Sequence, residues 1–129
     1  MESGGSDRRS VGRKGEELAC RLLEERGHRI LERNWRYGHL EIDIISMDPA
    51  GIHFVEVKTR CSNIQAPPQD NVDTAKQRRI AKAAQAYLRT SRGLPARNME
   101  CMFDVIAVTY GRDSVRTEYI EQAYIPVYI

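Results

Sequence analysis

The stretch that decides the fold is residues 40–59, which read LEIDIISMDPAGIHFVEVKT. Two segments rich in β-branched residues, 40–46 and 52–59, flank the turn-forming sequence DPAG at 48–51. β-Branched side chains suit the pleated surface of a sheet, and Pro and Gly favour tight turns. The stretch therefore predicts a β-hairpin.

Acidic residues alternate with apolar ones along this hairpin. Because side chains alternate across a strand, Glu41 shares a face with Asp43, and Glu56 shares a face with Lys58. A symmetric turn centred between residues 49 and 50 sets Asp43 opposite Glu56 and Glu41 opposite Lys58. Like charges opposite each other destabilise a sheet unless a cation compensates, and Mg²⁺ or Mn²⁺ prefers carboxylate oxygens. The hairpin is thus compatible with a metal site suited to phosphodiester hydrolysis, while the pattern alone favours a solvated sheet face.

Helices and further strands are expected around the hairpin. Leucines at helical spacing, acids at 16 and 17, and a stop at Gly27 predict a helix over 13–26. Asp73 or Asn71 can cap a second helix that ends near Thr90. Strands are expected over 30–35, 103–108 and 115–120. This order predicts an α/β fold with a mixed sheet of about five strands flanked by helices.

Length and composition limit the class of protein. The 129 residues fit one domain, which we place at 12–129 after a flexible tail over 1–11 that is rich in Gly, Ser and charge. No apolar run approaches the length of a membrane helix. Three widely spaced cysteines without a Cys-x-x-Cys pair disfavour a disulfide framework and a zinc ribbon. These features favour a cytoplasmic protein without a membrane partner.

Positive charge is concentrated in one segment. The formal net charge is only +2, yet residues 74–99 contain basic side chains and no acidic ones. Lysine and arginine contacts to phosphate give affinity without sequence choice, and a solvated helix face is the alternative interpretation. We assign nucleic-acid contact to four residues of the expected helix: Lys76, Arg78, Arg79 and Lys82.

Four blocks of sequence carry a resemblance to a known family. GRKGEELA at 12–19, ILERN at 30–34, EID at 41–43 and FVEVK at 54–58 resemble, in this order, the bacterial YraN family (UPF0102), which is related to archaeal Holliday-junction resolvases. Asp43 with the Glu-Val-Lys of 56–58 resembles the D…ExK core of PD-(D/E)xK nucleases. The sequence departs from the usual family pattern at Leu40, where a glycine is common.

This resemblance implies a restriction-endonuclease-like core and a Mg²⁺- or Mn²⁺-dependent endonuclease. It also implies that Glu16, Asp43 and Glu56 surround the metal and that Lys58 is catalytic. Gln85 and Tyr87 fall where some relatives place helix residues beside the site, and with Glu41 they are accessory candidates. His28, His39 and His53 have no metal-ligand spacing in the sequence, so no histidine is assigned to a metal.

Three functions stay open from the sequence. The first is an endonuclease of DNA, including branched or structured DNA. The second is a catalytically inactive nucleic-acid-binding module of the same fold. The third is a protein-interaction adaptor or homodimer, because residues 119–129 are unusually apolar for a chain end.

Overall fold

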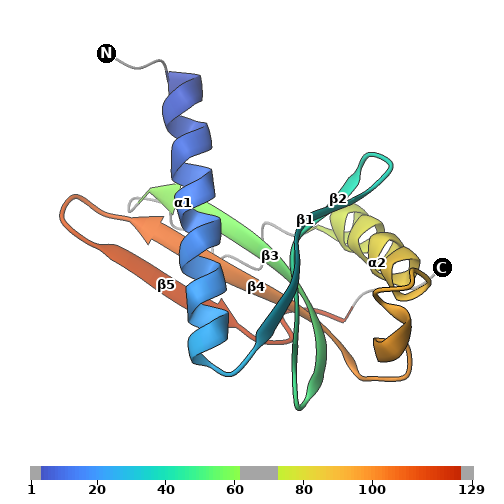
Figure 1. Cartoon of the computed structure of the whole chain (residues 1–129). Coiled ribbons are helices and arrows are strands. Elements are labelled where there is room, and N and C mark those ends of the chain that lie inside the picture. The colour runs from blue at the N-terminus through green and yellow to red at the C-terminus, as the bar shows by residue number, and fades with distance from the viewer. Residues whose placement is uncertain (1–3, 62–72, 126–129) are drawn as a thin grey trace.

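A computed structural model describes residues 4–61 and 73–125 of the chain (Figure 1). It confirms the expected α/β class. The elements follow in the order α1 (Gly4–Glu25), β1 (Arg29–Tyr37), β2 (Leu40–Asp48), β3 (Gly51–Cys61), α2 (Thr74–Leu88), the short 3-10 helix η2 (Leu94–Ala96), β4 (Cys101–Tyr110) and β5 (Val115–Ile120).

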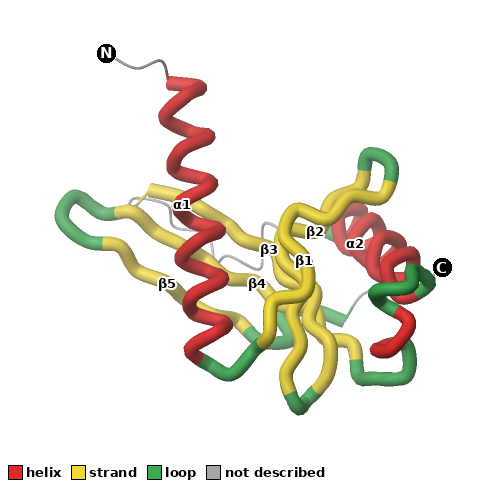
Figure 2. The backbone as a smooth tube through the Cα atoms, in the orientation of Figure 1, coloured by secondary structure: helices red, strands yellow, loops and turns green. Residues whose placement is uncertain are grey.

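The strands form one five-stranded sheet in the order β1-β2-β3-β4-β5 (Figure 2). The pairs β1–β2, β2–β3 and β4–β5 are antiparallel, whereas β3 and β4 run parallel. A parallel pair needs a crossover, and α2 lies on the chain between these two strands. The predicted mixed sheet of five strands flanked by helices is therefore confirmed.

The two helices cover opposite faces of the sheet. Neighbouring residues of β2 and β3 point alternately to one face and to the other. Ile44 and Val55 pack with Leu23 of α1, whereas Ile45 and Phe54 pack with Tyr87 of α2. Figure 1 shows α1 crossing the sheet while α2 lies beside β1 and β2. Within the described ranges, no helix is long and apolar enough to cross a membrane.

The helix ends agree in part with expectation. Gly27, with φ of 90°, follows the last turn of α1 as expected. Helix α2 begins after Asp73, whose side chain accepts a hydrogen bond from the Lys76 amide at 2.8 Å, while Asn71 lies outside the described residues. The predicted start of the first helix near residue 13 is wrong, because the helix begins at Gly4 and no proline interrupts it. The flexibility of residues 1–11 stays a prediction.

The register of the β2–β3 hairpin is the predicted one from Asp48↔Gly51 to Ile44↔Val55. The ladder stops there, and β2 continues along β1 alone, where Glu41 pairs with Arg36. The expected pairing of Glu41 with Lys58 is therefore wrong, because β2 leaves β3 as the twisted sheet opens. We call this point the fork, formed by Asp43 and Ile44 of β2 and by Val55 and Glu56 of β3.

Candidate active site at the fork

Asp43 occupies the position where the main-chain ladder between β2 and β3 ends. Its Oδ2 accepts a hydrogen bond from the backbone N–H of Val57 at 2.8 Å, so a side chain satisfies a β3 amide beyond the last ladder pair. Burial and the neighbouring charge of Glu56 raise the pKa of Asp43 to about 7, although the Val57 hydrogen bond opposes the shift. Glu16 and Glu41 act in the same upward direction. Three neighbouring acids thus disfavour the charged form of Asp43 at the fork.

Glu56 is buried and lies within ion-pair distance of two lysines, Lys58 and Lys76. Its Oε2 accepts a hydrogen bond from Lys76 Nζ at 2.5 Å and lies 3.5 Å from Lys58 Nζ. Burial and the neighbouring Lys76 lower the pKa of Lys58. Burial also opposes the charge of Lys76, but the hydrogen bond to Glu56 outweighs it and raises the pKa of Lys76. Of the two ammonium groups, Lys58 is therefore the one that loses its proton more readily.

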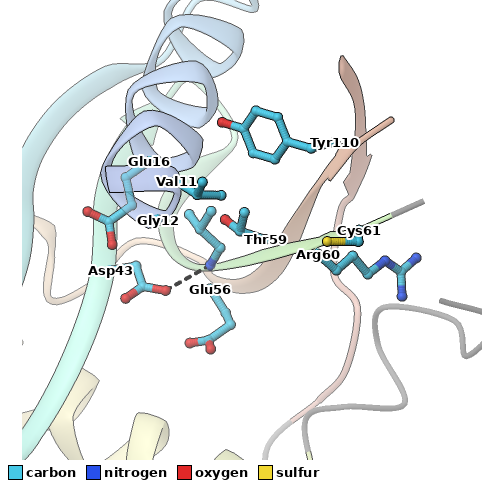
Figure 3. A pocket seen from close by; sticks show the side chains of 10 residues that line it. Val11, Gly12, Glu16, Asp43, Glu56, Thr59, Arg60, Cys61 and Tyr110 are labelled. Carbon is cyan, nitrogen blue, oxygen red and sulfur yellow. Dashed lines mark hydrogen bonds between the residues drawn. The ribbon is translucent and has the colours of Figure 1, made fainter. Parts of the chain in front are cut away.

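Glu16 reaches the fork from α1 because the helix packs closely on β3. A Cβ atom at Gly15 would lie 2.4 Å from Thr59 Oγ1, so only glycine permits this approach. Asn34 of β1 then donates a hydrogen bond to Glu16 Oε1 at 3.2 Å. Figure 3 shows the Glu16 side chain extending from α1 toward Asp43, with Glu56 on β3 below them.

Two pockets meet at the fork, and the same two acids line both. The larger, of about 620 Å³, is lined by Glu16, Asp43, Glu56 and residues near the carboxyl end of β3 (Figure 3). The smaller, of about 190 Å³, adds Glu41, Lys76 and Arg79 to Asp43 and Glu56. Asp43 and Glu56 thus stand between a space beneath α1 and a space beneath α2.

The predicted nucleic-acid residues lie at the start of α2 and differ in their positions. Lys76 contacts Glu56 and Arg79 lines the smaller pocket, whereas Arg78 and Lys82 are exposed. Of the two accessory candidates on the same helix, Gln85 is exposed and Tyr87 is buried in the core. The Tyr87 hydroxyl donates a hydrogen bond to Glu32 at 3.2 Å, and neither accessory residue lines the two pockets.

The donor set at the fork consists of carboxylate oxygens, which are the ligands of hard divalent cations. The nearby charge of Glu56 disfavours the ionised form of Asp43, a cost that such a cation removes. Among the described residues, however, the only group of three or more His, Cys, Asp or Glu side chains whose ligand atoms all lie within 4.8 Å of one another is elsewhere. At the fork itself, the ammonium of Lys76 neutralises Glu56.

That other group joins His28, Asp48 and His53, which sequence reasoning missed. The three residues are spread over 28–53, and folding brings them together because His28 follows α1 while Asp48 and His53 flank the hairpin turn. Asn34 was also missed as a partner of Glu16. Its positive φ of 52°, unusual for any residue but glycine, is visible only in the structure.

Comparison with known proteins places the chain among bacterial sequences of similar length. Residues 15–108 match the family described as "Uncharacterised protein family UPF0102". A UPF0102 protein of Chlorobium chlorochromatii is 50% identical over 98 residues, covering 76% of this chain and 73% of that protein. One of Geobacter metallireducens is 45% identical over 117 residues, covering 90% and 93%, and one of Bacteroides thetaiotaomicron is 36% identical over 122 residues, covering 94% and 97%.

Among solved structures, the chain is similar to one titled "The structure of Pyrococcus Furiosus SfsA in complex with Ca2+". The match covers 95% of this chain and 65% of that chain, with 18% sequence identity and a TM-score of 0.39. At this level of similarity the match carries no argument about function.

Proposed function

Because the chain belongs to the UPF0102 family, whose description states no activity, we propose from the residues at the fork that it is a metal-dependent endonuclease of the PD-(D/E)xK type acting on DNA. One observation carries the proposal. Asp43 and Glu56 lie so close at the end of the β2–β3 ladder that burial and mutual repulsion raise the pKa of Asp43 to about 7. A buried carboxylate beside a partly buried one, both facing a pocket, favours a divalent cation.

Asp43, Glu56 and Glu16 are the residues that would hold Mg²⁺ or Mn²⁺. When bound, such an ion stabilises charge on a phosphate and lowers the pKa of water. Glu16 is kept beside Asp43 by the close contact of α1 with β3 and by the hydrogen bond from Asn34. The Val57 backbone N–H, which has no ladder partner on β2, donates to the Asp43 carboxylate and holds it in place.

Lys58 supplies the second part of the chemistry. Its ammonium lies 3.5 Å from Glu56 Oε2, and its lowered pKa suits a group that orients a nucleophilic water or exchanges a proton with it. The exposed cations at the start of α2, Arg78 and Lys82, and Arg79 at the smaller pocket supply phosphate contacts next to these acids. Branched DNA is included as a substrate because the family resemblance implies it.

A second function is favoured by the ion pair between Lys76 and Glu56. An ammonium on the acid that would hold a metal fits a nucleic-acid-binding module without turnover. In that case the basic residues of α2 bind phosphate while the acids only position Lys76.

A cleavage assay with the whole chain distinguishes the two functions. Duplex, single-stranded and four-way-junction DNA are incubated with Mg²⁺ or Mn²⁺ and with the wild type, Asp43→Ala or Glu56→Ala. The exposed Glu118→Gln on β5 is a matched control for loss of an acid. We expect metal-dependent cleavage that both fork variants lose and the control keeps. Salt-sensitive binding without cleavage under any metal identifies the inactive module.

A further inference from the structure

A second group of metal-ligand side chains lies at the opposite end of the hairpin from the fork. It consists of His28, Asp48 and His53, which we call the histidine cluster. Along β2, Asp48 is five residues from Asp43, since 48 − 43 = 5, which is about 16 Å of extended strand. The cluster is therefore separate from the acids of the proposed nuclease site.

Each residue of the cluster offers one ligand atom, and these three atoms lie within 4.8 Å of one another. His28 Nε2 lies 3.4 Å from Asp48 Oδ2, and His53 Nε2 lies 2.8 Å from Asp48 Oδ1. A tetrahedral zinc ion with bonds of about 2.0–2.2 Å separates its ligand atoms by roughly 3.3–3.6 Å. The distance from His28 Nε2 to Asp48 Oδ2 already fits this value. The distance from His53 Nε2 to the other carboxylate oxygen, Asp48 Oδ1, has to increase by about half an ångström.

Both histidine rings are held by their other nitrogen. His28 Nδ1 is hydrogen-bonded to Ser46 Oγ at 2.9 Å, and His53 Nδ1 to Asp104 Oδ2 at 2.6 Å. Metal-binding histidines share this arrangement, in which one nitrogen faces the ion and an oxygen fixes the other. The Asp104 carboxylate is itself fixed, because it accepts hydrogen bonds from the Tyr119 hydroxyl and from the backbone N–H of Gln122.

The surroundings make the site both rigid and accessible. The side chains of His28 and His53 are each 2% exposed, and that of Asp48 is 18% exposed, so Asp48 alone opens the cluster to solvent. The His28 amide donates to the Leu23 carbonyl at 2.9 Å, which ties this residue to the end of α1. An ion here joins α1, the hairpin turn and, through Asp104, β4.

We propose that His28, Asp48 and His53 form a binding site for a zinc-type transition-metal ion, with three protein ligands and an open position, and that Ser46 and Asp104 orient the two imidazoles. Two imidazole nitrogens and a carboxylate oxygen are a donor set for Zn²⁺ or Co²⁺ rather than for Mg²⁺, and solvent beside Asp48 completes the coordination. The site does not depend on the nuclease proposal, because none of its residues lines the pockets at the fork.

The test is a Zn²⁺ titration of the full chain carrying Asp43→Asn and Glu56→Gln, which removes binding at the fork. We expect one zinc equivalent, a higher unfolding temperature, and a zinc X-ray absorption spectrum with nitrogen and oxygen ligands that include two imidazoles. In the same background, Asp48→Asn and His28→Gln should weaken zinc binding at least tenfold. His39→Gln is the matched control, because this third histidine is exposed and outside the cluster.

Asp48→Asn keeps a side-chain oxygen that accepts the hydrogen bonds from the Ala50 and Gly51 backbone amides, so this variant should fold. It therefore tests zinc binding by the cluster even if a histidine variant does not fold. The proposal is overturned if zinc does not bind, if the spectrum shows sulfur ligands, or if Asp48→Asn binds zinc as tightly as its parent. Absence of DNA cleavage by the wild-type chain, with zinc still bound to the cluster, would reject the nuclease alone.

Discussion

The Asp43 carboxylate accepts the backbone N–H of Val57 at 2.8 Å, one step beyond the last main-chain pair of β2 and β3. This bond holds a partly buried acid beside Glu56. The acid pair is a consequence of where the two strands separate, and the fork can be tested residue by residue.

Replacing the Asp43 charge should stabilise the metal-free protein at pH 8. Asp43→Asn keeps an oxygen that accepts the Val57 amide but removes the repulsion with Glu56. We expect a gain on the order of 1 kcal/mol in the free energy of unfolding, measured with urea. Mg²⁺ should raise the stability of the wild type and not that of the variant. A variant less stable than wild type at pH 8 would contradict the repulsion.

The pH dependence follows from the same group. The pKa of Asp43 is about 7 in the folded chain against an ordinary 3.8, so the folded state binds this proton more tightly than the unfolded state. Its contribution to stability is complete below pH 3.8 and is lost as pH rises toward 7. A divalent metal displaces the proton, so metal affinity should rise over the same interval. Thermal unfolding across pH, with and without Mn²⁺, measures both trends, and Asp43→Asn should lack them.

The contact between α1 and β3 should be intolerant of a single methyl group. In Gly15→Ala, the added Cβ meets Thr59 Oγ1 at 2.4 Å, which pushes the helix and Glu16 away from the fork. We expect a loss of about 1–3 kcal/mol in unfolding free energy and reduced cleavage. Gly12→Ala is the matched control, because nothing lies within 4 Å of its Cβ. The double variant Gly15→Ala/Thr59→Ala should regain part of the lost unfolding free energy. If it does not, the contact with Thr59 is not the cause of the loss.

Removing Lys76 should strengthen metal binding while weakening DNA binding. Its ammonium is hydrogen-bonded to Glu56 Oε2, and a metal at Glu56 has to displace it. For Lys76→Met we expect several-fold tighter Mn²⁺ binding by calorimetry, since the competing ion pair is absent. Arg78→Met, an exposed neighbour on the same helix, should leave the Mn²⁺ affinity unchanged. Equal affinities for wild type and Lys76→Met would show that the ion pair does not compete.

The hairpin could be predicted because its signal is local. β-Branched segments flank one turn sequence, and the register from Asp48↔Gly51 to Ile44↔Val55 follows from that turn. The cap at Asp73 and the strand at 115–120 are local signals too, and both are confirmed. Membership in UPF0102 rested on four short blocks and is confirmed by the family match.

The fork and the histidine cluster could not be predicted, because they depend on tertiary geometry. The register of a symmetric turn placed Glu41 opposite Lys58, but beyond Ile44 strand β2 pairs with β1 alone, so the register argument fails there. His28 and His53 lack a ligand spacing in the sequence and meet only when the end of α1 packs against the hairpin. The roles of Glu16, Asp43, Glu56 and Lys58 stay predictions, as do a DNA partner, a homodimer and the cytoplasmic location. Part of the apolar C-terminal segment packs on the core through Ile120, Ala123 and Tyr124.

The parallel pairing of β3 with β4 has a consequence for the order of folding. The β2–β3 pairs begin across a two-residue turn, whereas the first β3–β4 pair, Ile52↔Cys101, joins residues 101 − 52 = 49 apart. Closing the longer loop costs more chain entropy before any contact forms. We therefore expect the hairpin that carries Asp43 and Glu56 to form early in folding and β4 to dock onto it late. Substitutions in the hairpin should slow refolding, whereas those in β4 should mainly accelerate unfolding.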